Sequence, residues 1–564
     1  MKHNNQKDSA KIIKKTLIIF VFAVFAKISL ACTNIIVTPG ATTDGSCVIT
    51  YSADSHILYG ELNFIPAADH PDTATIKIYE WDTGKFLGKI KQIKHTYAVI
   101  GHINEYQVSI TETTFGGRPE LQDTTAILDY GNLMFITLQR AKTARQAIHI
   151  IAQLVNEYGY YSTGETFSIA DPQEAWIMEI IGKGVKIKYK EKGKNKKPIN
   201  VNKGAVWVAM RIPDGYICAH ANQSRIRKFP LHDTMNCLYS PDVISFAREM
   251  KYFNGKDEDF SFADAYAPID FEGARFCEAR VWSVFRRVNK AMYEYIDYAS
   301  GENLKNVMPL WIKPEKKLTI KEIMELMRDY FEDTPFDLTK DIGAGPYKCP
   351  IRWRPLTWKV DSIECFNERA ISTQQTGYSV IAQMRSWLPR QVGGILWFGV
   401  DDTYMTVYTP FYCGITKIPI YFAQNNGSIM KFSETSSFWI FNQVSNLAYT
   451  RFSLMIDEIK QRQDELEAYY LTLIPLADQV IFQILEQDTI KAIKFMNEFC
   501  NSLATYTFNE WKNLYQFLFV KYLDGNIKIP TNNDRYPRVL HPGYSDEWYK
   551  LILEKTGNKF ILKK

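Results

Sequence analysis

One cysteine stands where its chemistry could change during maturation. Cys32 directly follows Ser29-Leu30-Ala31, a small-x-small site of the kind that signal peptidase cuts. Cleavage after Ala31 would make Cys32 the N-terminal residue and free its α-amine. Because an α-amine has an ordinary pKa of about 7.7–8.0, it could take the proton of the neighbouring thiol near neutral pH. The position therefore allows a cysteine nucleophile that carries its own general base.

Two other fates of Cys32 fit the same position. The residue could be a lipid-anchored cysteine, although lipoprotein signals usually have Leu three places earlier and this chain has Ser29 there. It could also be a structural cysteine, with or without a disulfide partner. Residue 32 alone leaves all three fates open.

The first 31 residues carry the whole excess of positive charge. The formal net charge is +5, from 67 basic and 62 acidic residues; six of the basic residues and one acidic residue lie in this stretch, which leaves 61 of each sign elsewhere. This balance gives no electrostatic case for a nucleic-acid partner.

The same stretch has the pattern of a signal peptide. Its basic start ends at Lys14-Lys15 and is followed by an apolar run over 17–26, which is too short to span a hydrocarbon core of about 30 Å. The sequence predicts a signal peptide over 1–31 and a secreted or periplasmic protein without stable membrane insertion.

The elements after Cys32 predict a hairpin that returns to it. Residues 33–37 form a β-rich run, Pro39-Gly40 and Asp44-Gly45 indicate turns, and 47–51 form a second strand. The returning strand ends at Asp54, so the Asp54 carboxylate is expected beside the new α-amine. It could hold an ammonium group there, or it could simply be a turn residue at the end of a strand.

The segment over 32–56 resembles the mature start of the C69 peptidases, dipeptidases of the N-terminal nucleophile hydrolase superfamily. The resemblance continues in order along most of the chain, through short motifs at 101–105, 112–117, 167–179, 211–215, 220–223, 343–346 and 397–402. It implies an α+β fold, the αββα sandwich of that superfamily. It also implies that Cys32 is the nucleophile of a cysteine dipeptidase, which cleaves dipeptide amide bonds through an acyl-enzyme.

The resemblance further implies the other site residues. It favours Asp54 and Asn222 as catalytic residues, Asn222 for the oxyanion, with Asn104 as a second choice that would also contact the substrate. Glu112, Arg211 and Arg225 are candidate partners for substrate charges, although an ordinary surface ion pair is the favoured alternative for any single one of them.

The chain departs from the C69 pattern in two places. Many relatives have Arg-Asn where this chain has Tyr51 and Ser52, and several have Asn where it has Glu165. Part of the electrostatic stabilisation of a Cys32 thiolate would then have to come from elsewhere in the chain.

The remaining chain predicts a core over 32–440 and a mostly helical extension over 441–564. The helix expected over 143–158 is amphipathic and begins at Thr143, and Pro475 is expected to break the helical extension. We expect the extension to pack on the core; a subunit interface is the alternative, so a homo-oligomer is possible. The lysine-rich run over 186–203 reads as a solvated hairpin. Neither a metal nor a cofactor is predicted, because there is no HExxH, CxxC, GxSxG or Walker motif.

Two competing functions stay open beside the exported dipeptidase. An N-acyl amidohydrolase of the same fold would need an apolar pocket in place of a site for a free amine. A non-catalytic surface lipoprotein would carry its lipid on the sulfur of Cys32, which excludes catalysis by that atom.

Overall fold

The strand that begins just after Cys32 lies inside a seven-stranded antiparallel sheet. The computed structural model describes residues 32–192, 195–353, 355–533 and 535–563, so the predicted signal peptide lies outside the described residues. The order of the sheet is β18 (Trp311–Ile312), β16 (Ile217–His220), β1 (Asn34–Val37), β2 (Cys47–Asp54), β21 (Thr376–Met384), β22 (Gly394–Val400) and β23 (Thr409–Tyr412). The predicted hairpin of β1 and β2 is confirmed, and Ser52 N donates to Thr33 O at 3.0 Å.

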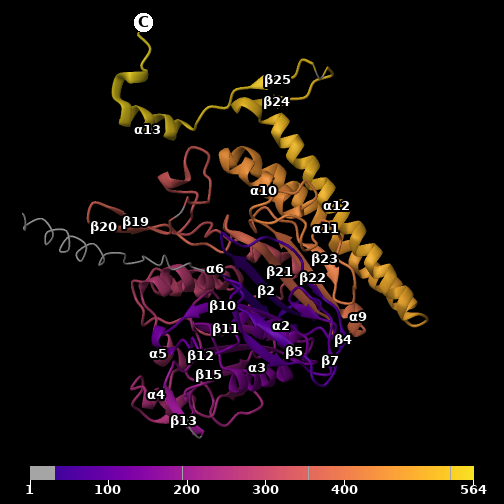
Figure 1. The fold of residues 1–564 in the computed structure, drawn as a ribbon. Coiled ribbons are helices and arrows are strands. Elements are labelled where there is room, and N and C mark those ends of the chain that lie inside the picture. Colours follow the sequence, from indigo (N-terminus) through magenta and orange to yellow (C-terminus); the bar gives the residue numbers. More distant parts are fainter. Residues whose placement is uncertain (1–31, 193–194, 354, 534, 564) are drawn as a thin grey trace, which may run out of the picture. The chain divides into compact units, whose positions relative to one another are not determined.

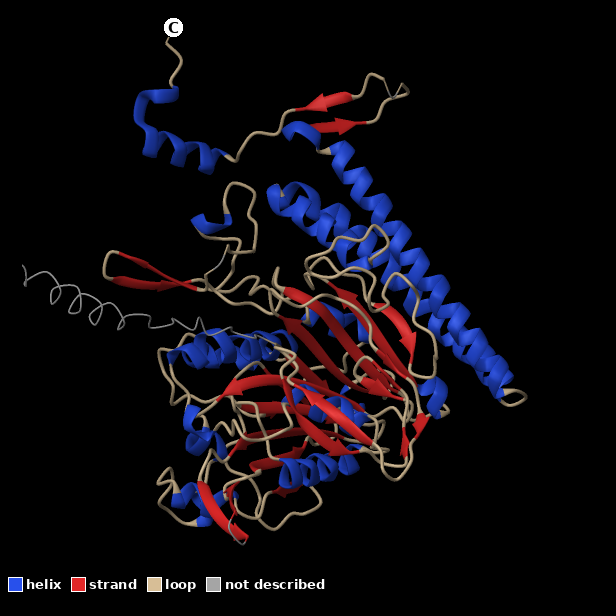
Figure 2. Ribbon diagram, in the orientation of Figure 1, coloured by secondary structure: helices blue, strands red, loops and turns tan. Residues whose placement is uncertain are grey.

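A second sheet has eight strands. Its order is β17 (Cys237–Tyr239), β15 (Ala205–Arg211), β12 (Ala175–Gly182), β11 (Gly164–Ala170), β10 (Ser109–Gly116), β9 (Ile103–Asn104), β8 (Val99–Ile100) and β3 (Phe64–Ile65). Neighbouring strands are antiparallel throughout both large sheets. Figure 2 shows the two groups of strands and the helices around them.

Polar side chains join the two sheets near Cys32. His220 of β16 lies 2.7 Å from Thr113 Oγ1 through Nδ1 and 2.7 Å from Ser168 Oγ through Nε2. The Asn34 amide lies 2.8 Å from Thr111 Oγ1. Burial lowers the pKa of His220 to about 3, so the imidazole is neutral and can bridge two hydroxyl groups. The strand that carries the cysteine is therefore tied to the facing sheet as well as to its neighbours.

Helices cover each sheet on the side away from this polar layer. α2 (Tyr130–Leu138) and α3 (Ala144–Tyr158) pack on β10, β11 and β12 (Figure 1). The helix predicted over 143–158 is confirmed: Thr143 Oγ1 accepts from Gln146 N at 3.1 Å and caps it, and its apolar stripe is buried. The molecule is thus an α+β protein with antiparallel sheets.

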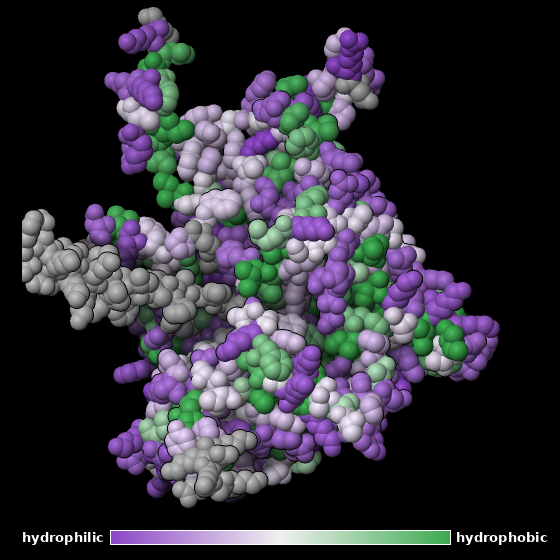
Figure 3. Space-filling model, in the orientation of Figure 1, coloured by the Kyte–Doolittle hydropathy of each residue, from purple (hydrophilic) through white to green (hydrophobic). Residues whose placement is uncertain are grey.

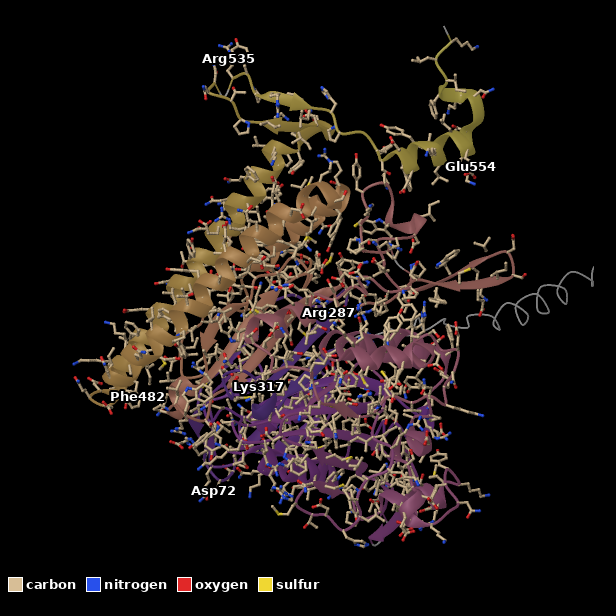
Figure 4. The ribbon with its side chains drawn as sticks, turned by 180° about the vertical axis from the view of Figure 1, so that it is seen from behind. Asp72, Arg287, Lys317, Phe482, Arg535 and Glu554 are labelled. Atoms are coloured by element: carbon tan, nitrogen blue, oxygen red, sulfur yellow. The ribbon has the colours of Figure 1, made fainter. Side chains whose placement is uncertain are left out.

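The last strand of the seven-stranded sheet is followed by three helices of 14 or more residues: α10 (Ser437–Thr450), α11 (Phe452–Leu485) and α12 (Thr489–Lys521). α11 and α12 run side by side, with Phe482 near the end of α11 (Figure 4), and both contact β23. The described residues, from Cys32 onward, belong to one compact unit by their contacts. The buried pair of Arg385 with Asp478 joins the end of β21 to α11.

The prediction that Pro475 breaks this region is wrong, because α11 continues through it. The lost backbone hydrogen bond is offset by burial of Tyr470, Ile474 and Ile481 on the same helix. α11 is also long and apolar enough, by length and composition, to cross a membrane. Its packed face nevertheless carries Glu467, which pairs with Arg328 at 2.5 Å. On the face of the molecule that Figure 3 shows, apolar and polar residues are intermixed.

The other elements are short. The lysine-rich run forms the predicted hairpin, β13 (Ile187–Lys192) with β14 (Asn195–Asn200), and β19 (Thr357–Val360) pairs with β20 (Ile363–Phe366). Four helices follow β17 and precede β21 along the chain: α4 (Val243–Glu249), α5 (Phe262–Tyr266), α6 (Ala279–Val288) and α8 (Ile320–Leu326). After α12 come β24 (Ile527–Ile529), β25 (Arg538–Leu540) and α13 (Asp546–Thr556), which has no buried residue.

Candidate active site

The thiol of Cys32 lies between a tyrosine hydroxyl and a carboxylate. Its Sγ is 3.7 Å from Tyr51 Oη and 3.9 Å from Glu112 Oε1, and the residue is 3% exposed in the chain that still carries residues 1–31. Burial, and then the negative charges of Glu112 and Asp54, raise the pKa of the Cys32 thiol well above its ordinary value. The sulfur is therefore protonated at neutral pH in the uncut chain, and a nucleophilic role requires a base.

Asp54 ends β2 and is held by three donors. Arg369 Nη2 and Thr376 Oγ1 each donate to its carboxylate at 2.6 Å, and Ser52 Oγ donates at 3.1 Å. The same Ser52 oxygen accepts from Thr33 N at 3.2 Å. The hairpin thus brings Asp54 to the backbone next to Cys32, as its sequence position indicates.

A buried arginine joins the nucleophile to Asn222. Arg280, at the start of α6, donates from Nη1 to Cys32 O at 2.6 Å and to Thr33 Oγ1 at 2.8 Å. Its Nη2 donates to Ala221 O at 3.1 Å and to Asn222 Oδ1 at 2.9 Å. One guanidinium therefore holds the backbone at Cys32 together with the side chain of Asn222, a fork geometry that lysine cannot reproduce.

Local backbone geometry supports this arrangement. Asn222 has φ of 65°, a left-handed conformation that asparagine tolerates better than most residues, and its Nδ2 donates to Thr114 O at 2.8 Å. The turn before Arg280, Gly273–Glu278, is π-helical, a distortion that often accompanies functional sites. Burial and the neighbouring Arg369 lower the pKa of Arg280 to about 10, so it still carries its charge at neutral pH.

Glu112 and Glu165 lie side by side on neighbouring strands. Glu112 of β10 faces Phe167 in the register, and Thr114 faces Glu165 of β11, so the two carboxyl groups are diagonal neighbours on one face. Tyr51 Oη donates to Glu112 Oε1 at 2.5 Å, and Thr114 Oγ1 donates to Glu165 Oε2 at 3.1 Å. Burial is the largest cause that raises the pKa of each carboxyl group.

The structure does not bring Asn104 or Arg211 to this site. Asn104 Oδ1 accepts from Tyr106 N and Val108 N, and its Nδ2 donates to the carbonyl oxygens of Leu138 and Ala141, all within 3.0 Å. Arg211 lies on β15, three strands from β10, and its Nε is 3.1 Å from Glu174. Within the described ranges neither residue contacts Cys32.

Two site residues escaped the sequence reasoning. Arg280 and Arg369 stand far from Cys32 along the chain, in segments with no motif of their own, and only folding brings them to Cys32 and Asp54. Tyr51 and Glu165 were noticed as departures from the C69 pattern, and this was the available signal for their place in the site.

A cluster of three carboxylates away from Cys32 is a candidate metal site by its spacing. Glu325, Asp464 and Glu467 lie close enough to share an ion. However, Lys321 Nζ lies 2.6 Å from Asp464 and 2.7 Å from Glu467, and Arg328 also pairs with Glu467. These cations already balance the carboxylates, so the cluster fits an ion-pair network that joins α8 to α11.

Comparison with known proteins decides the family. Residues 31–465 match the sequence model of peptidase family C69. The chain belongs to this family. The expected resemblance is therefore confirmed, and the protein is a peptidase. The matched range begins one residue before Cys32.

Relatives across the family carry dipeptidase names. A probable dipeptidase of Salmonella dublin is 24% identical over 411 residues, which cover 68% of this C69 peptidase and 82% of the relative. The dipeptidase of Bifidobacterium longum is 22% identical over 501 residues, covering 81% and 84% of the two chains. Dipeptidase A of Lactobacillus helveticus is 22% identical over 443 residues, covering 75% and 82%.

Proposed function

We propose that the protein is an exported cysteine dipeptidase that acts through an acyl-enzyme on Cys32, which becomes N-terminal when the signal peptide over 1–31 is removed. We also assign its two facing sheets and flanking helices to the αββα sandwich of N-terminal nucleophile hydrolases. The observation that carries the proposal is the position of Cys32: it heads an interior strand at the point where both the family match and the compact unit begin. The mature protein would be secreted or periplasmic.

The α-amine of Cys32 supplies the base in this proposal. It takes the thiol proton, the thiolate attacks the carbonyl carbon, and a sulfur–carbon bond forms while the carbonyl oxygen becomes an oxyanion. Asn222, which Arg280 links to the backbone of Cys32, is the proposed oxyanion donor. The ammonium then protonates the leaving amine as the carbon–nitrogen bond breaks.

Water completes the reaction. The α-amine removes a proton from water, the hydroxide attacks the thioester carbon, and the sulfur–carbon bond breaks to restore the thiol. Asp54 is linked through Ser52 to Thr33 N, so it is suited to orient the new N-terminus.

Dipeptides are the proposed substrates because the relatives that align with most of the chain are named dipeptidases. The acidic surroundings of Cys32 also suit a substrate with a free ammonium group close to the scissile bond. An N-acyl amidohydrolase would place an uncharged acyl group there, against Glu112 and Glu165.

The test starts from protein exported by cells that express the full chain. Intact mass and N-terminal sequencing should give an unmodified mature chain that begins Cys-Thr-Asn-Ile-Ile. A thioether-linked lipid on Cys32, or a mature chain that begins at another residue, would contradict the mechanism.

Variants of two buried cysteines complete the test. Cys32→Ala should abolish dipeptide hydrolysis and leave the far-ultraviolet circular dichroism spectrum unchanged. Cys413→Ala, which removes a buried thiol elsewhere, should keep activity. Faster hydrolysis of N-acetylated amino acids than of dipeptides would favour the amidohydrolase instead.

A further inference from the structure

In the part of the chain that the structure describes, the buried carboxyl groups of Glu112 and Glu165 have no cation beside them. Glu112 is 2% exposed and Glu165 is fully buried. Among the residues that the structure describes, no Lys, Arg or His forms an ion pair with either carboxyl group. Glu112 Oε2 and Glu165 Oε1 also receive no hydrogen bond from an N–H group or a hydroxyl group of the described residues. Buried carboxylates are normally paired, so this arrangement calls for a partner.

Among the described residues, the groups that interact with the pair supply no positive charge. They are tyrosines, a thiol and an aspartate, and His102, whose ring lies 5.0 Å from the ring of Tyr51, is neutral because burial lowers its pKa to about 4. The facing groups are Cys32, Tyr51, Asp82, Tyr130, Tyr160 and Tyr378.

The two carboxyl groups are diagonal neighbours on one face of the sheet, and burial raises the pKa of both. Two neighbouring carboxylates in a low-dielectric site resist ionising together, so one proton is shared while the site is empty.

We infer that Glu112 and Glu165 bind the α-ammonium group of the substrate, and that this ammonium displaces the proton shared by the two carboxyl groups. The inference rests on the proposed function, since it takes Cys32 as the nucleophile. The displaced proton passes to the solvent, and the ammonium nitrogen replaces it between the two carboxylates.

The distance to the nucleophile supports this assignment. Glu112 Oε1 lies 3.9 Å from Cys32 Sγ. A carbonyl carbon poised for attack lies about 3–3.5 Å from the sulfur, and the amino nitrogen of the same residue is two bonds from that carbon. The nitrogen thus falls within reach of Glu112. Tyr51, which donates to the same Glu112 Oε1 at 2.5 Å, keeps that carboxylate in position.

Free and N-acetylated alanyl-alanine separate this role from a structural one. In the mature protein, Glu165→Gln should lower kcat/KM for the free dipeptide at pH 7.5 about tenfold or more. The value for the acetylated dipeptide should change less than about threefold, because it carries no ammonium. The KM of the unaltered protein should fall as the pH rises from 5.5 to 7.5, because the shared proton becomes easier to displace, and Glu165→Gln should flatten this dependence.

Glu179→Gln is the matched control. Glu179 is also a fully buried glutamate of the eight-stranded sheet, but Ser224 Oγ and the amides of Arg225 and Ile226 satisfy its carboxylate. This variant should keep the ratio of kcat/KM between free and acetylated dipeptides. Equal losses for both substrates in Glu165→Gln would overturn the inference and would fit an internal cation, the α-ammonium of Cys32, between the carboxyl groups.

Proton release provides a readout without turnover. Mature Cys32→Ala protein would be titrated with alanyl-alanine at pH 6.5, where the dipeptide amine is charged, in buffers of different ionisation enthalpy. We expect about one proton released per dipeptide bound, and almost none with Glu165→Gln added. Binding without proton release would refute the inference. If no dipeptide is hydrolysed by the unaltered protein, the proposed function fails, whereas hydrolysis with the wrong selectivity rejects only the role of the carboxyl pair.

Discussion

Replacing Arg280 with lysine keeps the charge but removes the fork that holds the site. Arg280 donates five hydrogen bonds, to Phe276 O, Cys32 O, Thr33 Oγ1, Ala221 O and Asn222 Oδ1, at 2.6–3.1 Å. An ammonium group on a lysine stem can reach about two of these acceptors at once, which leaves about three of them without a donor.

The loss should be large in both stability and rate. Each charge-assisted hydrogen bond contributes about 1.5–3 kcal/mol, but single substitutions rarely cost more than about 5 kcal/mol because the surroundings relax. We therefore expect Arg280→Lys to destabilise the fold by about 3–5 kcal/mol. The misplacement of Cys32 against Asn222 should lower kcat about a hundredfold in the fraction that stays folded.

A double-mutant cycle with Asn222→Ala tests how Arg280 acts. Asn222→Ala alone should cost about 10²–10³ in kcat if Asn222 is the oxyanion donor. If Arg280 acts by holding Asn222, the double variant should be little worse than Asn222→Ala alone. Steady-state kcat and thermal melting would be measured on all four mature proteins. Fully additive losses, or a kcat of Arg280→Lys within twofold of the unaltered protein, would refute the reasoning.

Three further predictions concern other parts of the molecule. Burial raises the pKa of Asp401 to about 7 from an ordinary 3.8, so the protein loses stability as the pH rises between these values. Asp401→Asn should therefore stabilise the protein by up to about 4 kcal/mol at pH 8 and little at pH 4. An effect on the melting temperature that does not depend on pH would contradict this. Asp478→Ala leaves Arg385 buried without its partner and should cost about 3–5 kcal/mol in unfolding free energy, whereas exposed Asp464→Ala should cost about 1 kcal/mol or less; equal losses would argue against the buried pair. Asn104→Ala should lower the melting temperature but keep kcat/KM in the folded protein, and a selective loss of kcat would return Asn104 to the active site.

Local patterns predicted the elements that depend on nearby residues. The hairpin that returns Asp54 to Cys32 follows from two β-rich runs and the turn residues between them. The helix over 144–158 follows from its cap and its apolar stripe. Both signals act over a few residues, so the sequence alone contains them.

The contacts that complete the site could not be read in this way. Arg280 is 248 positions from Cys32, and nothing in an amphipathic helix distinguishes an arginine that faces the nucleophile from one that faces solvent. Asn104 and Asn222 look alike in the sequence as candidate oxyanion donors. Only the fold shows that the side-chain amide of Asn104 accepts hydrogen bonds from the turn at Tyr106 and Val108. The continuation of α11 through Pro475 likewise depends on tertiary burial that outweighs a local preference.

The interior position of β1 has a practical consequence for anyone who produces the protein. Chain ends usually fray and accept added residues, but β1 is paired on both sides, and Cys32 leads directly into it. An affinity tag left before Cys32 would have to extend from a buried residue and would block the α-amine. The helix α13 has no buried residue, so a purification tag after residue 564 should disturb neither the sheets nor the nucleophile.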